Sequence, residues 1–202
     1  MSAGGGHWAD PIRTQLAQAA MLGDAMRRDD TMIAALGAVV DAVVAAFRAG
    51  GKVLLCGNGG SAAQAQHIAA EFVGTFRAER PPLPAVALTT DTSVMTAVGN
   101  DITFEAIFAS QIEALGRPGD VLIGISTSGT SRNVIRALET ANDRGLVTVA
   151  LTGAGDGDLH RCADYCLRVP SDDTPRVQEG HVVLGHVMCE LVEAALQRKM
   201  ER

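Results

Sequence analysis

The sequence has few aromatic residues and no excess of positive charge. Aromatic residues make up 3% of the 202-residue chain, so its core must be built from alanine, valine, leucine and isoleucine, the usual filling of helix–sheet layers. The formal net charge is −6, whereas a nucleic-acid-binding surface normally carries a basic stripe. We therefore expect no nucleic acid among the partners.

Long hydrophobic runs and a secretory leader are also missing. No stretch reaches the roughly 18 uninterrupted apolar residues of a membrane span, and the start, MSAGGGHWAD, lacks the basic and apolar segments of a signal peptide. The cysteines form no CxxC pair and lie in or beside apolar runs, as small reduced hydrophobic residues do; they are Cys56, Cys162, Cys166 and Cys189. These absences predict a cytoplasmic protein with no membrane partner.

Length and composition predict one domain. A chain of 202 residues, 47% hydrophobic and 20% charged, is long enough for one substantial core and too short for two. It contains no internal repeat, low-complexity tract or linker. We expect a flexible N-terminus over residues 1–9, with no assigned function, and a single domain over residues 10–202 that includes N-terminal helices.

The first 50 residues favour helices. One apolar periodicity covers residues 12–26 and ends at the polar RRDD segment. A second begins at Asp30 and ends at Gly50 and Gly51, a typical helix stop. This second helix is apolar on most of its circumference, so we expect it to need more than one neighbour, which suggests contact with another subunit.

From Lys52 onward, short apolar runs alternate with helical stretches. The runs are KVLLCG, PAVALT, DVLIGIS, LVTVALTG and YCLRVPS. Unbroken apolar strands are covered on both faces, and strands that alternate with helices form right-handed parallel units. A last long helix is expected over residues 174–199. The pattern predicts an α/β fold with a parallel sheet between layers of helices.

Two loops rich in glycine and hydroxyl groups follow predicted strands. Residues 57–61 (GNGGS) follow KVLLC, with a helix expected from Ala62, and residues 126–131 (STSGTS) precede the helix NVIRALETA. Ligands of open parallel sheets bind beyond the carboxyl ends of the strands, and a helix N-terminus favours an anion. Without the P-loop lysine or a complete GxGxxG motif, these loops suit a sugar phosphate. Alternatively, Ser126 and Ser131 cap helices and the glycines form tight turns.

Histidines and carboxylates stand in apolar surroundings on two predicted helices. His67 and Glu71 share a helix face in AQHIAAEFVG, and His186 lies in VVLGHVMCELV. Such groups need partners, so they either satisfy one another structurally or form a site. Gln178 precedes His186 by about 12 Å of helix rise. One metal would reach both only if the Gln178 side chain leans toward His186 or if two subunits contribute, and Glu190 is a competing carboxylate.

The motifs resemble, in order, those of the bacterial phosphoheptose isomerases, within the sugar-isomerase (SIS) domain superfamily. The resemblance is specific at GNGGSAAQAQHIAAEFVGTF and continues through LTTDTSVMTAVGND, GDVLIGISTSGTSRNVIRAL and VPSDDTPRVQEGHVVLGHVMCELVE. It implies a three-layer fold with a five-stranded parallel sheet, assembled as a homotetramer with active sites between subunits. It also implies conversion of sedoheptulose 7-phosphate to D-glycero-D-manno-heptose 7-phosphate, which supplies heptose for lipopolysaccharide or related glycoconjugates.

The resemblance further implies the site residues. One zinc ion per subunit would be held by His67, Glu71, Gln178 and His186. Substrate contacts would fall on Asn58, Gly59, Gly60, Glu71, Asn100, Asp101, Ser126, Thr127, Ser128, Ser131 and Gln178.

Catalysis by proton transfer is expected from Glu71 and His186. A carboxylate in an apolar setting is a competent base, so we expect Glu71 to remove the proton beside the carbonyl and His186 to assist at the neighbouring carbon or its oxygen. The alternative function is a non-catalytic tetramer of the same domain that binds a protein partner such as the replication initiator. The presence of all the implied zinc ligands favours the isomerase.

Overall fold

Five parallel strands form one sheet in the computed structural model, which describes residues 6–197. In chain order the strands are β1 (Val53–Gly57), β2 (Ala85–Ala87), β3 (Val121–Ile125), β4 (Val147–Thr152) and β5 (Tyr165–Arg168). Their order across the sheet is β2-β1-β3-β4-β5, and every neighbouring pair is parallel. Each strand lies within the apolar run that predicted it, so the α/β fold class with a five-stranded parallel sheet is confirmed.

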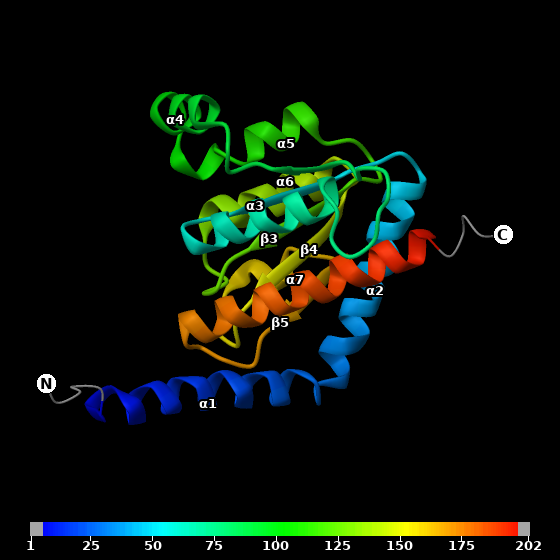
Figure 1. Ribbon diagram of the computed structural model, residues 1–202. Helices are drawn as coiled ribbons and strands as arrows, with labels where there is room; N and C mark the ends of the chain where they lie inside the picture. The colour runs from blue at the N-terminus through cyan, green and yellow to red at the C-terminus, as the bar shows by residue number, and fades with distance from the viewer. Residues whose placement is uncertain (1–5, 198–202) are drawn as a thin grey trace, which may run out of the picture.

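Helices cover both faces of this sheet (Figure 1). The α-helices of the described residues are α1 (Ala9–Met26), α2 (Asp30–Arg48), α3 (Gly60–Val73), α4 (Thr92–Asp101), α5 (Ala109–Leu115), α6 (Arg132–Asp143) and α7 (Thr174–Gln197). Short 3-10 helices are η1 (Gly6–Trp8), η2 (Phe104–Ala106) and η3 (Asp158–Arg161). The last two residues of the predicted C-terminal helix, 198–199, lie outside the described residues.

Alternate strand residues pack into two separate cores. Val53 and Leu55 of β1 face a core formed with α2, α3 and α7, whereas Leu54 and Cys56 face a core formed with α5 and α6. β1 and β3 are buried along their whole length, which explains why their sequences are apolar without interruption. The two helices that carry the predicted metal ligands, α3 and α7, therefore share one face of the sheet and contact each other.

The first helix starts earlier than the sequence pattern indicated. Residues 1–5 of the predicted flexible segment lie outside the described residues, whereas Gly6–Trp8 form η1 and Ala9 begins α1. By length and composition α2 is apolar enough to cross a membrane. In this fold one side of α2 packs against α7 and β5 in the core, whereas Ile33 is 48% exposed. The expected contact of α2 with a second subunit stays a prediction.

Helix boundaries near the loops differ from the sequence pattern in two places. α3 begins at Gly60 instead of Ala62, because Gly59, with φ +54°, turns the chain directly into the helix. α4 had no prediction; none of its side chains is fully buried, and its apolar side, with Met95 and Val98, is only partly buried against the second core. Its start is fixed locally by Asp91, whose carboxylate accepts a hydrogen bond of 3.0 Å from the Val94 amide. Figure 1 shows α4 at the outer edge of the molecule, apart from α7.

Candidate functional site

The two predicted phosphate loops are joined at the carboxyl ends of β1 and β3. The strands pair with Gly57 beside Ile125, which brings the following residues together. The side chains of Asn58 and Asn133 exchange two amide hydrogen bonds, each 2.8 Å long. Asn133 is buried and had no prediction, although a polar side chain on the apolar face of the helix after the second loop is a signal that could have found it. The pair fixes one loop against the other.

Hydroxyl groups of the second loop bond to one another. The Oγ atoms of Ser126 and Ser131 lie 2.8 Å apart, and Ser128 Oγ lies 2.9 Å from Thr130 Oγ1. Ser131 stands at the N-cap position of α6, yet its side chain makes no capping hydrogen bond. Ser131 therefore occupies the cap position without a capping hydrogen bond from its side chain, at a helix N-terminus that favours an anion.

The first loop is shaped by a close approach of Gln178. The Gln178 carboxamide lies against Gly60, where an added Cβ would collide with the amide nitrogen and lie 3.1 Å from Cδ. The Gln178 carbonyl also accepts a hydrogen bond of 2.8 Å from Gln64 Nε2. Gln178 thus sits at the start of α3, roughly 10 Å of helix rise before His67. A larger residue at position 60 would push the Gln178 side chain out of its place against the loop.

Three of the predicted metal ligands converge where α3 meets α7. His67 Nε2 lies 2.7 Å from His186 Nε2 and 3.5 Å from Glu71 Oε1. The three donor atoms all lie within 4.8 Å of one another. The ring of Phe76 packs beside His186, with the ring centroids 5.6 Å apart. The side chains are only partly buried, 45% exposed for His67 and 21% for Glu71, so a substrate can reach the cluster.

This donor set fits a divalent metal ion. Two imidazole nitrogens and one carboxylate oxygen are ligands that zinc accepts, and three protein ligands leave a position open for a substrate. Two histidine nitrogens at 2.7 Å must share a proton or face a common cation. Glu190, the competing carboxylate, is instead paired with Arg77 at 3.1 Å. Within one chain the fourth predicted ligand, Gln178, lies at Gly60.

Asn100 and Asp101 lie at the exposed end of α4. Asn100 Nδ2 donates a 2.7 Å hydrogen bond to Asp101 Oδ1. α4 packs mainly against η2. The structure therefore brings the two phosphate loops together, and His67, Glu71 and His186 together, but joins Asn100 and Asp101 to neither group within one chain.

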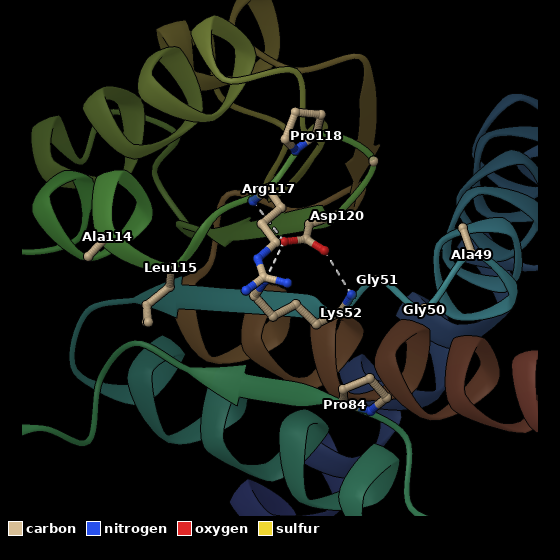
Figure 2. Close-up of a pocket in the computed structure, with 11 residues that line it drawn as sticks. Ala49, Gly50, Gly51, Lys52, Pro84, Ala114, Leu115, Arg117, Pro118 and Asp120 are labelled. Carbon is tan, nitrogen blue, oxygen red and sulfur yellow. Dashed lines mark hydrogen bonds and ion pairs between the residues drawn. The ribbon is translucent and has the colours of Figure 1, made fainter.

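A hollow lies at the amino end of the sheet, opposite the phosphate loops (Figure 2). Its volume is about 540 Å³, between the end of α2 and the segment before β3. Its buried carboxylate, Asp120, accepts hydrogen bonds of 2.9 Å from the Lys52 and Arg117 amides and pairs with Lys52 Nζ at 2.5 Å. Asp120 and Lys52 are thus occupied with each other and with the backbone, and no histidine lines the hollow.

His181 of α7 is buried without serving the cluster. It is fully buried, and neither ring nitrogen has a hydrogen-bond partner among the described residues. Burial lowers the pKa of His181 to about 4, and the nearby Thr152 backbone offsets only part of that effect. The ring is consequently neutral at physiological pH. Burial likewise raises the pKa of Cys56 and of Cys189 to about 12, so these unpaired thiols stay protonated.

Known proteins share this sequence and arrangement. The model of the SIS domain matches residues 19–153. The phosphoheptose isomerase of Roseiflexus sp. (strain RS-1) is 57% identical over 174 residues, 86% of this chain and 88% of that protein. The phosphoheptose isomerase of Aquifex aeolicus (strain VF5) is 60% identical over 155 residues, with coverages of 77% and 81%. The structure of phosphoheptose isomerase from Neisseria gonorrhoeae matches with a TM-score of 0.86 at 40% identity, covering 92% of this chain and 98% of that one.

Proposed function

The chain belongs to the SIS-domain family and, within it, to the phosphoheptose isomerases, and from this premise we propose that it converts sedoheptulose 7-phosphate to D-glycero-D-manno-heptose 7-phosphate. The observation that carries the proposal is the convergence of His67, Glu71 and His186 where α3 meets α7, together with the start of α3 at a phosphate loop. The phosphate loop and His67 are separated by roughly 10 Å of α3. That span is comparable to an extended seven-carbon sugar phosphate.

The phosphate end is assigned to the two joined loops. Ser126, Thr127, Ser128 and Ser131 offer hydroxyl groups and backbone amides before the start of α6. Asn58, Gly59 and Gly60 offer backbone amides and one carboxamide at the start of α3. A phosphate without magnesium needs donors and a positive helix end, both of which are available here. Gln178 suits a substrate contact where it lies, beside Gly60. For Asn100 and Asp101 the proposal rests on the family resemblance.

The proton transfers are assigned to Glu71 and His186. Isomerisation between an aldose and a ketose removes a proton beside a carbonyl and returns one to the adjacent carbon. Glu71, 21% exposed and 3.5 Å from His67, is placed to act as the base, and His186 to move the proton at the second carbon or its oxygen. A carboxylate that also binds a metal is a weaker base, so Glu71 cannot act fully as base and as metal ligand in the same step.

A zinc ion is proposed for the same cluster. His67, Glu71 and His186 would hold it, and when bound it would supply a Lewis acid that polarises the sugar carbonyl. Because Gln178 lies against Gly60, it would complete the ligand set only by turning toward His186 or by approaching from a second subunit.

A homotetramer with active sites between subunits is proposed from the exposed apolar side chains. Val183, Val187 and Leu191 recur every four residues on α7, each more than a third exposed, and they flank His186. α1 adds further exposed apolar side chains at Ile12, Leu16 and Met21. Apolar surface of this extent beside a site marks an interaction face. We further propose that the enzyme works in the cytoplasm without nucleic acid or membrane partners, consistent with its net charge of −6.

The alternative, a non-catalytic tetramer that binds a protein partner such as the replication initiator, is not favoured. The relatives at 57% and 60% identity are named phosphoheptose isomerases, and the cluster of His67, Glu71 and His186 is complete.

Turnover of sedoheptulose 7-phosphate tests the proposal. The assay compares the protein as purified, after thorough chelation, and after addition of Zn²⁺. We expect an aldoheptose phosphate as product, lost on chelation and restored by Zn²⁺. Activity that survives chelation would keep the isomerase and remove the metal. No turnover under any condition, with the assembly intact, would overturn the function in favour of the binding protein.

A further inference from the structure

We propose that the buried ion pair between Arg80 and Glu193 is a positioning device that holds Glu71 in place beside His186. The inference rests on the proposed isomerase function for its kinetic test. Arg80 lies in the loop between α3 and β2, and Glu193 lies on α7. Their side chains are 6% and 4% exposed, with Arg80 Nε 2.8 Å from Glu193 Oε2. Neither residue stands out in the sequence, since 113 positions separate them.

Arg80 binds the end of the helix that carries the base. Its Nη2 donates to the carbonyl oxygen of Glu71 itself, and its Nη1 to that of Phe72, both at 2.8 Å. These carbonyls belong to the last turn of α3, where the helix supplies no partners of its own. A cation at this point also complements the negative end of the helix dipole. Arg80 therefore fixes the backbone from which the Glu71 side chain projects.

Glu193 connects the same loop to the helix that carries His186. Its Oε1 accepts hydrogen bonds from the amides of Arg77 and Ala78, at 3.1 and 2.9 Å. Glu193 follows His186 by seven residues, close to two helical turns, so the two residues share one side of α7. The adjoining Phe76 packs its ring against His186. The network thus touches both Glu71, through its carbonyl, and His186, through Phe76.

A role in stability alone accounts poorly for this arrangement. Burying two charges costs desolvation energy that often cancels their attraction, so a buried ion pair is a weak source of net stability. The planar guanidinium of Arg80 spends all three nitrogens on separate acceptors, Glu193, Phe72 and Glu71, a geometry that lysine cannot reproduce. What the pair secures is the relative position of two helix segments that carry reacting groups.

The chain contains a matched control in the segments that precede β1 and β3. Asp120, like Glu193, is a buried carboxylate that accepts two backbone amides and one cationic side chain. Its side chain is 2% exposed, and its partner Lys52 is 20% exposed. Figure 2 shows Lys52 and Asp120 in the hollow, which none of the residues His67, Glu71 and His186 lines. Replacing Asp120 disturbs a comparable network without touching α3 or α7.

The experiment compares Arg80→Lys and Glu193→Gln with Asp120→Asn in the full-length protein. Glu193→Gln preserves volume and an oxygen for the two amides, so it tests the pair even if Arg80→Lys fails to fold. Three quantities are measured: kcat and KM for sedoheptulose 7-phosphate, the affinity for Zn²⁺ by competition with a chromogenic chelator, and Tm.

We expect both site variants to lower kcat and Zn²⁺ affinity about 10–100-fold, the usual effect of losing a group that orients a ligand. KM should stay within about threefold, because the phosphate loops are untouched. Asp120→Asn should lower Tm at least as much and leave kcat and Zn²⁺ affinity unchanged. Equal kcat and affinity losses in all three variants, or none in the site variants, would overturn the positioning role.

The proposed function can fail separately. If the wild type binds Zn²⁺ but does not turn over sedoheptulose 7-phosphate, the function is wrong, and Zn²⁺ affinity alone decides the role of the pair. If it turns the substrate over without binding Zn²⁺, kcat decides. A wild type that does neither overturns both inferences.

Discussion

Two buried ion pairs of the same design have different surroundings. Asp120 and Lys52 tie the end of α2 to the segment before β3. Beside the histidine cluster, Glu193 and Arg80 tie α7 to the end of α3. Each carboxylate has the same number and kind of donors. The two pairs differ in the backbone that they hold. The Asp120 pair holds the segment before a strand, whereas the Glu193 pair holds the backbone of Glu71.

This comparison separates stability from function within one fold. In open parallel sheets, ligands bind beyond the carboxyl ends of the strands, and here both phosphate loops stand there. The hollow at the amino end holds Asp120 and Lys52, which are paired with each other and with the backbone. The converging donors on α3 and α7 therefore locate the site in this molecule, and a hollow does not. Variants of the two ion pairs should consequently lose different properties.

The largest expected effect comes from removing the base. Glu71→Gln keeps the size of the side chain but cannot accept the proton, so kcat should fall about 10²–10⁴-fold, the share that general base catalysis supplies. Because the phosphate loops are unchanged, phosphate should still protect the variant against thermal unfolding. Enzyme assays together with Tm in the presence of inorganic phosphate check both parts. Near-normal turnover would eliminate Glu71 as the base.

For Asp120 we expect a loss of stability with no loss of activity. Asp120→Asn places an amide hydrogen donor against Lys52 Nζ or a backbone amide, so the unfolding free energy should fall by about 3 kcal/mol. Activity per folded molecule should not change, because no contact of Asp120 reaches α3 or α7. Urea unfolding at pH 7 and kcat measured below Tm test this. An Asp120→Asn variant that keeps its stability and loses activity would contradict the assignment of this ion pair to stability.

Local sequence predicted the sheet, because strand burial is written in consecutive residues. Leu54 and Leu55 are apolar because both faces of β1 are covered, and such runs located every strand. The α4 helix was not found in this way, since it is short and fully buries none of its side chains, although Asp91 caps its start. The start of α3 was placed two residues late because the backbone angle of Gly59 is not visible in a sequence.

The site was predicted as far as its contacts lie on one helix or follow a known motif. His67 and Glu71 share a helix face by spacing, but the approach of His186 depends on how α7 crosses α3. The spacing of Gln178 from His186 left its position open, and packing against Gly60 settles it within one chain. The Arg80–Glu193 pair joins residues far apart in the sequence, and no local pattern announces such a pair.

His181 is a third buried titratable group, and its ring nitrogens have no hydrogen-bond partner among the described residues. The pKa of His181 is about 4 in the folded protein, against 6.5 for an ordinary histidine. Between these values the unfolded chain binds more protons, so stability falls as pH falls through this window. From pH 7 to pH 5 His181 should account for a loss of about 2 kcal/mol.

Replacement of this histidine isolates its share of the pH dependence. His181→Leu fills the buried site without a titratable ring, so its unfolding free energy should fall less between pH 7 and pH 5 than that of the wild type. Urea unfolding of both proteins at the two pH values gives the difference directly. Parallel pH dependences in the two proteins would mean that His181 is not buried in its neutral form.

The smallest effect is expected for a pair of neutral side chains, Asn58 and Asn133. Asn58 and Asn133 exchange their hydrogen bonds across the two phosphate loops, and Asn133 is 3% exposed. A double-mutant cycle with Asn58→Ala and Asn133→Ala should give a coupling energy of about 1 kcal/mol in unfolding. Asn133→Ala should also raise KM, because the loops are no longer held in one register, while kcat changes less. Independent effects of the two substitutions would show that the loops keep their register without the pair.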